Sequence, residues 1–547
     1  MPFLLLSAAF FGRVAAAAPG AQGLTTIGPE KKIISGGADI RSADYVRAHV
    51  AEMERVAFDG ICINVYRRVD GKIEPVNLRV MDPVPLRYED YAEAVADLKA
   101  TPFKRFKDNF LWAWIASAPG VVPVDFFDDP AVMIANWRTA ALIAKEGGYR
   151  GLFVDTEQYE TPVGPFAWTR VKYSATKSKA EYAAQARKRG AEVMRAVNEV
   201  FPDIHMLWFM GYSANGPDRS RFGAYAFVPD FIDGMLDEAR PEARIIDGYE
   251  TSYGLKTEPF FAAARDLMKN KMKATSPAPA IFERQHQAGF GLWLDCHGTA
   301  MGWNPADFSK NYFTPEEFEY SLHQALAHSD RYVWVWFERG SFFTGANIPW
   351  PYERALTEAR RPHPVQPASI PANPPPGALA PLVLRGYAGE DPSSLIGTHL
   401  KWLADLPRRF RWRPDPRSVG FDEKWYAFDF NDAQGWSSLL TGIEHWEVEG
   451  YKYECASWYR QRFDIPPLPW GKKVYLLFES KNEDVWIWID GRPIPSDRVV
   501  SAANGKPLLV DVTGYLRSNV QNLIALRRRS GLESGGAWNA IRLVVEK

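Results

Sequence analysis

The chain has 547 residues, too many for one hydrophobic core, so we expect two or more domains. Its 65 Lys and Arg balance 66 Asp and Glu, and a net charge of -1 lacks the basic excess typical of a nucleic-acid-binding protein. The 20 Trp are unusual. Indole rings fill apolar cores, but they also match the flat C–H faces of sugars, so both interpretations stay open.

The first 22 residues are predicted to be a signal peptide. An apolar run from Phe3 to Phe11 precedes the small residues Ala15 to Ala18, which suit a signal peptidase. The run is too short to cross a bilayer, and no later apolar stretch reaches that length. We therefore expect a secreted or periplasmic protein without a membrane span.

Residues 31–360 alternate short apolar runs with longer helical patterns, which is typical of βαβ units around a parallel sheet. The predicted strands lie near residues 32–39, 60–66, 109–117, 151–159, 205–212, 244–251, 289–295 and 332–338. Helical segments separate these strands, and the helical period is clearest in residues 44–56 and 179–200. Eight such units over about 310 residues predict a (β/α)8 TIM barrel.

The chain changes character after this region. Residues 361–381 are rich in Pro and are predicted to form a semi-rigid linker. Residues 382–547 show alternating strand patterns, with a tight turn at Asp490-Gly491. This second part is predicted to be an all-β sandwich.

Side chains along a barrel strand alternate between the axis and the helix layer. If the aliphatic set of each strand faces the helices, polar and aromatic groups gather near the carboxyl ends of the strands, where barrel enzymes hold their active sites. The side chains predicted to face the axis and to bind substrate are Asp39, Asn64, Tyr66, Trp112, Trp114, Trp208, Tyr212, Trp293, Asp295, Trp336 and Glu338. Core filling is the alternative for the indoles.

Residues 151–159 contain the strongest chemical signal. Phe153, Asp155 and Glu157 share one face of the predicted strand, and two neighbouring carboxylates repel, so the pKa of one of them must rise. We predict that Glu157 is a general acid, with Asp155 beside it, and that Glu250 is the catalytic partner. Asp247 has the opposite parity to Glu250. The alternative is a buried carboxylate pair held by Arg or Lys.

No metal or cofactor is expected. The three Cys lie far apart and form no CxxC pair, and the nine His show no HExxH or comparable spacing.

Two family resemblances follow from particular segments. The C-terminal part resembles the sugar-binding jelly-roll of family 2 glycoside hydrolases at Trp458–Arg460, Phe463–Pro466, Val485–Gly491, Val510–Leu516 and Asn522–Leu526. The resemblance implies a galactose-binding-like jelly-roll sandwich. The domain order is reversed here, because that family carries this domain before its barrel.

The second resemblance lies in the barrel. Asp155 and Glu157 match the D-x-E end of the family 18 chitinase strand, with Phe153 in place of an earlier Asp. Together the residues and resemblances predict a glycoside hydrolase with a carbohydrate substrate. A non-catalytic glycan-binding protein on a barrel scaffold and a polysaccharide lyase stay open as alternatives.

Overall fold

The computed structural model describes residues 26–157, 163–216, 225–295 and 303–361 of the N-terminal part. It then describes residues 382–384 and 399–547, the latter with gaps at 408, 416–417, 441–455, 470, 479–482, 502–507, 519 and 530–540. The predicted signal peptide and nearly all of the predicted linker lie outside the described residues.

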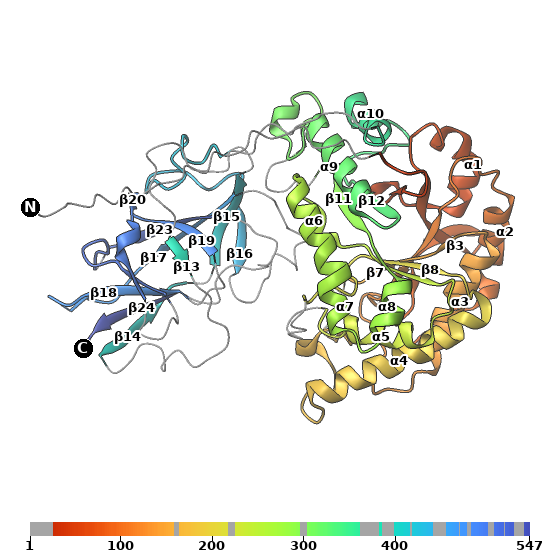
Figure 1. The fold of residues 1–547 in the computed structure, drawn as a ribbon, viewed down its shortest axis with the longest axis horizontal. Coiled ribbons are helices and arrows are strands. Elements are labelled where there is room, and N and C mark those ends of the chain that lie inside the picture. Colours follow the sequence, from red (N-terminus) through yellow and green to blue (C-terminus); the bar gives the residue numbers. More distant parts are fainter. Residues whose placement is uncertain are drawn as a thin grey trace, which may run out of the picture.

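A sheet of parallel strands forms the centre of the N-terminal part (Figure 1). Its main strands are β1 (Lys32–Ser35), β3 (Gly60–Val69), β6 (Phe110–Trp114), β7 (Gly151–Asp155), β8 (His205–Trp208), β9 (Arg244–Asp247), β11 (Phe290–Trp293) and β12 (Tyr332–Trp336). Neighbours follow chain order from β9 back through β3 to β1, which pairs with β12. The short strands β2 (Arg41–Ser42), β4 (Lys72–Val76) and β5 (Leu78–Arg79) attach at β3 and β6.

One short segment brings the two ends of this sheet together. Strand β10 (His286–Ala288) pairs with β9, whereas β11, only one residue further on, pairs with β12. Gly289 is the residue between them, and a Cβ at this position would lie 2.9 Å from the Asp247 carbonyl oxygen. The sheet is therefore nearly closed, which confirms the predicted parallel barrel in its coarse form.

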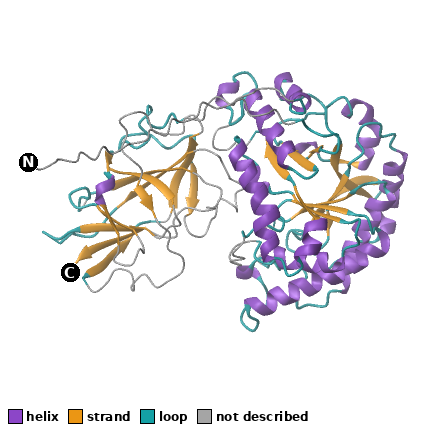
Figure 2. Ribbon diagram, viewed as in Figure 1, coloured by secondary structure: helices purple, strands orange, loops and turns teal. Residues whose placement is uncertain are grey.

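Helices surround this sheet, as the purple ribbons of Figure 2 show. They are α1 (Ala43–Met53), α2 (Ala92–Ala100), α3 (Ala131–Glu146), α4 (Lys179–Val200), α5 (Val228–Glu238), α6 (Glu258–Asp266), α7 (Met272–Thr275), α8 (Pro279–Gln285), α9 (Pro315–His328) and α10 (Trp350–Glu358). Capping boxes start two of them, Ser178 with Glu181 at α4 and Thr314 with Glu317 at α9. No described helix is long and apolar enough to cross a membrane.

The barrel axis is filled by its own aromatic cluster. Its buried members are Ile34, Cys62, Phe110, Phe153, Leu207, Phe209, Ile246, Tyr253, Tyr332 and Trp334. Trp112, Trp293 and Trp336 pack against this cluster, which confirms their predicted inward direction. Val333, Val335 and Phe337 of β12 belong to the cluster facing the helices, also as predicted.

The predicted direction of β8 is wrong. Leu207 and Phe209 face the axis, and Trp208 lies in the helix layer, with its ring centroid 5.9 Å from that of Trp137 and 6.2 Å from that of Phe231. Both faces of a parallel barrel strand are buried, so the side chains on both faces are apolar. Apolar character alone therefore does not reveal which face of the strand points to the axis. Trp208 is a core residue between β8 and helices α3 and α5.

Tyr212 and Tyr66 also lie outside the axis, contrary to prediction. The Tyr212 hydroxyl donates to Asp233 of α5 at 2.6 Å, and its ring packs on Phe282 of α8. The Tyr66 hydroxyl donates to Asp97 of α2 at 2.5 Å. In both cases a carboxylate on a surrounding helix provides the partner that a buried phenol needs, and this draws the ring outward.

The described elements after Arg361 are strands and one 3-10 turn, η9 (Ser496–Arg498). They are β13 (Leu382–Leu384), β14 (Leu400–Asp405), β15 (Arg409–Asp415), β16 (Ser437–Leu440), β17 (Ala456–Phe463), β18 (Val474–Phe478), β19 (Glu483–Ile489), β20 (Arg492–Pro493), β21 (Val499–Ser501), β22 (Leu508–Asp511), β23 (Asn522–Arg529) and β24 (Ile541–Glu546). They form two antiparallel sheets, β13-β19-β23-β17-β15-β16 and β14-β24-β18-β22-β21. The all-β character is confirmed, while the jelly-roll topology and the domain boundaries stay predictions.

Many of the indoles are packing residues of this second part. Trp425, Trp436, Trp458, Trp486 and Trp488 form one buried cluster on the first of these sheets. Tyr426 stacks on Trp488 with 5.3 Å between ring centroids. For these residues, core filling explains the high Trp content.

Candidate functional site

The first carboxylate pair stands at the end of β7. Asp155 is only 3% exposed, and its Oδ1 accepts a hydrogen bond of 2.9 Å from the Glu157 backbone N–H. Burial raises the pKa of Asp155 well above its ordinary value, and the charge of Glu157 raises it further. The indoles of Trp114 and Trp112 act in the opposite direction. Glu157 is only partly buried. The pair therefore consists of a buried Asp155 with a raised pKa and a Glu157 that solvent reaches.

Three indoles lie next to this pair. The rings of Trp112 and Trp114 on β6 meet edge to face, with their centroids 5.0 Å apart. The ring of Trp112 also lies 6.3 Å from that of Trp336 on β12, so side chains of two strands that are separated by β3 and β1 meet here. The Trp336 Nε1–H in turn donates to Glu338 at 3.2 Å.

A second carboxylate pair stands at the ends of β11 and β12. Asp295 is 3% exposed and accepts hydrogen bonds from Trp293 Nε1 at 2.6 Å, Arg339 N at 3.0 Å and Glu338 N at 3.3 Å. Burial raises the pKa of Asp295 to about 6, and the charge of Glu338 acts in the same direction. Glu338 itself is exposed. The sequence predicted both residues as sugar ligands but did not predict that they form a pair.

The two pairs share one design. In each, a buried Asp lies beside a Glu that solvent reaches, and the contact between Trp112 and Trp336 links the two sides. Glycosidic bond hydrolysis needs one carboxyl that holds a proton and a second that is ionised. The raised pKa values of Asp155 and Asp295 make these two buried groups the ones that hold a proton more readily than an ordinary Asp.

Glu250 has a different setting from the one predicted. It opens the 3-10 turn η4 (Glu250–Ser252), is 4% exposed, and its backbone N–H donates to the Phe209 carbonyl at 3.1 Å. Strand β9 ends at Asp247, and Tyr249 has a φ of 45°, so strand parity does not extend to Glu250. Its role as the catalytic partner stays a prediction.

Asp247 lies on the outer side of β9. It accepts a hydrogen bond of 2.8 Å from the Ser213 N–H, and its Oδ2 lies 3.9 Å from His286 Nε2. Burial raises the pKa of Asp247.

Asp39 connects two loops at the carboxyl ends of the barrel strands. Its carboxylate accepts hydrogen bonds from Ser341 Oγ at 2.5 Å and from Phe342 N at 2.8 Å, so it ties the end of β1 to the loop after β12. Asn64 on β3 is partly buried, and its Oδ1 has no hydrogen-bond partner. This oxygen is itself buried, so the predicted role of Asn64 as a sugar ligand stays a prediction.

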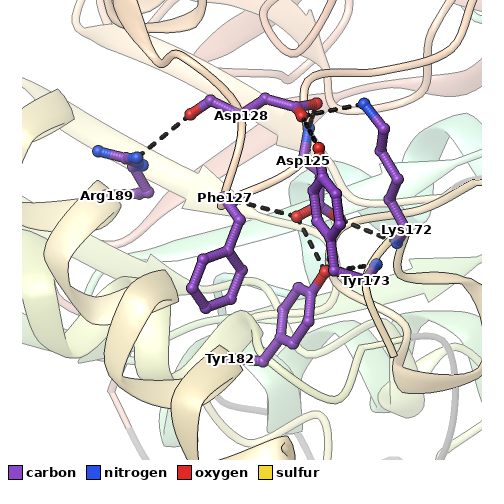
Figure 3. A network of polar contacts seen from close by, with 7 residues as sticks. All are labelled: Asp125, Phe127, Asp128, Lys172, Tyr173, Tyr182 and Arg189. Carbon is purple, nitrogen blue, oxygen red and sulfur yellow. Dashed lines mark hydrogen bonds and ion pairs between the residues drawn. The ribbon is translucent and has the colours of Figure 1, made fainter. Parts of the chain in front are cut away.

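A polar network fixes the loops that follow β6 and β7 (Figure 3). Asp125 accepts hydrogen bonds from the Tyr182 hydroxyl at 3.0 Å and from the Lys172 N–H at 3.1 Å. Asp128 accepts from the Tyr173 hydroxyl at 2.6 Å and from Lys172 Nζ at 2.9 Å. The network thus joins helix α4 to both loops and anchors the chain beyond Glu157. Sequence reasoning missed it, because its members lie far apart in the chain.

Among the described residues, no group of three or more His, Cys, Asp or Glu could hold a metal ion.

The raised pKa of Asp295 makes stability depend on pH. A carboxyl whose pKa is higher in the folded state gives stability that is fully present below its ordinary pKa and is lost as pH rises through about 6. Asp295→Asn removes this titration. The wild type should therefore lose stability relative to the variant as pH rises, and we expect the difference between their free energies of unfolding to fall by about 2 kcal/mol from about pH 4 to pH 7. Urea unfolding at several pH values measures it, and a pH-independent difference would contradict the prediction.

No protein-family model matches the chain. A segment of 98 residues is 29% identical to a β-glucuronidase of Formosa agariphila. This match covers 18% of the present chain and 9% of the β-glucuronidase. The chain thus spans only a small part of the curated relative that it matches.

Solved structures give partial matches as well. A β-glucuronidase of an uncultured Clostridium species is 16% identical over 27% of this chain and 30% of its own, with a TM-score of 0.21. A family 2 glycosyl hydrolase of Bacteroides cellulosilyticus is 18% identical over 26% and 21%, with a TM-score of 0.20. The chain is therefore weakly similar, over part of its length, to glycoside hydrolases that include β-glucuronidases. The resemblance to family 18 chitinases stays a prediction.

Proposed function

We propose that this protein is a glycoside hydrolase that cleaves an extracellular oligo- or polysaccharide by carboxylate acid/base catalysis. The observation that carries the proposal is the presence of two carboxylate pairs, Asp155 with Glu157 and Asp295 with Glu338, on either side of the Trp112–Trp336 contact. The partial similarity to a β-glucuronidase supports the class of reaction. The predicted signal peptide supports a secreted or periplasmic location.

In this mechanism Glu157 donates a proton to the leaving-group oxygen. Asp155 is buried and accepts a hydrogen bond from the Glu157 N–H, so the two carboxyl groups compete for ionisation and together retain a proton. Glu157 is the member of the pair that solvent reaches, so a glycosidic oxygen can approach its carboxyl group. General acid catalysis of this kind contributes about 10²–10⁴-fold to the rate.

Glu338 is the partner that we assign to Glu157. It is exposed, and the Trp336 Nε1–H donates a hydrogen bond of 3.2 Å to its carboxylate, which holds that carboxylate beside the indole. An ionised Glu338 would attack the anomeric carbon or activate a water molecule, depending on its separation from the acid. Glu250, the partner favoured by the sequence, is almost fully buried, and its Oε2 is covered. Glu338 therefore suits contact with a substrate better.

The indoles Trp112 and Trp336 give this site its apolar surface. Both residues are partly buried rather than fully buried, and indole suits the C–H face of a pyranose. Because the partial relative is named a β-glucuronidase, a β-linked uronic acid is the first sugar to test.

The experiment is turnover by the full-length wild type. We expect release of nitrophenol from at least one of the p-nitrophenyl β-glucuronide, β-glucoside, β-galactoside and β-xyloside, with loss of that activity in Glu338→Gln. New reducing ends from oligosaccharides are the second readout. A product with an unsaturated uronate, which absorbs in the ultraviolet, would identify a lyase instead. Sugar binding without any turnover would identify a glycan-binding protein and end the proposal.

A further inference from the structure

Trp350, the first residue of α10, is the most exposed large hydrophobic residue in the described part of the chain, at 66%. Trp is highly buried on average, so an indole exposed to this degree is uncommon. The guanidinium of Arg354, one helical turn further on, lies 5.3 Å from its ring centroid. This cation–π contact steadies the ring from one side and leaves the rest of the indole to solvent.

Topology and contacts place Trp350 on the face that carries the carboxylate pairs. In this barrel a helix that follows a strand begins at the carboxyl end of that strand, and α10 follows β12. The Tyr352 hydroxyl donates to the Phe313 carbonyl at 2.7 Å, and its ring lies 5.0 Å from that of Trp303. Both partners belong to the segment between β11 and α9, next to which α10 lies (Figure 1).

The loop between Glu338 and Trp350 is held in place. The Trp303 Nε1–H donates to the Asn347 carbonyl at 2.9 Å, and Asn347 Nδ2 donates to the Arg339 carbonyl at 2.6 Å. The Ser341 N–H donates to Ala346 at 2.9 Å. The position of the exposed indole is thus fixed relative to Glu338, as a preformed binding surface requires.

We propose that Trp350 is an outer sugar-binding platform, on which a pyranose unit stacks at a distance from the bond that is cleaved. The inference rests on the proposed function and deepens it, since it makes the substrate a glycan chain that runs from the axial site over the rim. A glycan is favoured over a protein partner, because neither the exposed loop of residues 344–347 nor the rest of α10 contains another exposed large hydrophobic residue, so Trp350 is not part of a broad apolar patch.

The molecule offers a matched control for this platform. Trp402 on β14 is 45% exposed, and the guanidinium of Arg542 lies 4.9 Å from its ring centroid. It has the same indole–guanidinium arrangement but belongs to the C-terminal sheets.

The test is native gel electrophoresis of the full-length protein through gels that contain glucuronoxylan, alginate or mixed-linkage β-glucan. We expect at least one polysaccharide to retard the wild type, and Trp350→Ala to bind that polysaccharide about tenfold more weakly. Trp350→Phe keeps an aromatic face and should retain most of the binding, and Trp402→Ala should match the wild type. The kcat/KM of Trp350→Ala on a p-nitrophenyl monosaccharide should be unchanged, because this substrate does not reach the rim.

Several results would overturn the proposal. They are a wild type that no gel retards, unchanged retardation of Trp350→Ala, or an equal loss in Trp402→Ala. A change in the oligomeric state of Trp350→Ala, measured by light scattering, would instead make the indole part of a contact between copies of the chain. Retardation needs no turnover, so failure of this inference is separate from failure of the proposed hydrolysis.

Discussion

Glu157→Gln is expected to lower kcat/KM on oligosaccharides by about 10²–10⁴-fold while leaving the fold intact. Gln keeps the size of the side chain but has no proton to give to the leaving oxygen. An activated aryl leaving group departs without that proton, so the loss on p-nitrophenyl glycosides should be much smaller. Parallel kinetics on an oligosaccharide and on the aryl glycoside of the same sugar measure this difference.

Glu89→Gln is the matched control for that experiment. Glu89 is an exposed residue in the 3-10 turn η2 (Tyr88–Tyr91), so the same chemical change there should leave both activities near the wild type. If a normally folded Glu157→Gln retains its activity on oligosaccharides, the assignment is wrong. The acid must then be sought among Asp155, Glu250, Asp295 and Glu338.

The barrel could be predicted because the hydrophobic pattern of the sequence switches clearly between short apolar strand runs and helical segments, and each switch is visible within a short stretch of chain. Repeated apolar runs and helical segments marked all eight main strands, from β1 to β12. The facing of a strand was harder to predict. In β12 the alternation of Val333 and Val335 with Trp334 and Trp336 gave the correct answer. In β8 the same rule failed, because Leu207 fills the axis and Trp208 fills the helix layer.

The candidate site was predictable only where its residues are neighbours in sequence. Asp155 ends β7 and Glu157 follows two residues later, so their closeness follows from sequence proximity, although the strand ends before the predicted residue 159. Asp295 and Glu338 come from different strands, and their pairing depends on the turns after β11 and β12. The position of Glu250 depends on the left-handed backbone conformation of Tyr249. The sequence did not predict this conformation, because it is typical of Gly or Asn and not of Tyr.

The largest effect on stability is expected from Lys256→Met. Lys256 is fully buried; its Nζ donates to the Tyr312 carbonyl at 2.6 Å and to Glu317 at 3.1 Å. Met fills a similar volume, but it leaves the Glu317 carboxylate buried without this cation. Breaking one side of a buried ion pair typically costs about 3–5 kcal/mol, and we expect a loss of that size in the free energy of unfolding.

The comparison variant is Lys310→Met. Lys310 pairs with Asp307 at 3.2 Å, but both side chains are exposed, so its loss should stay below about 1 kcal/mol. Urea unfolding of both variants gives the two values, and equal losses would contradict the prediction. The Lys256 contact also ties the segment after Glu250 to Tyr312, near the loops of the catalytic face. A fall in kcat alongside the loss of stability would therefore show that this buried pair also positions the site.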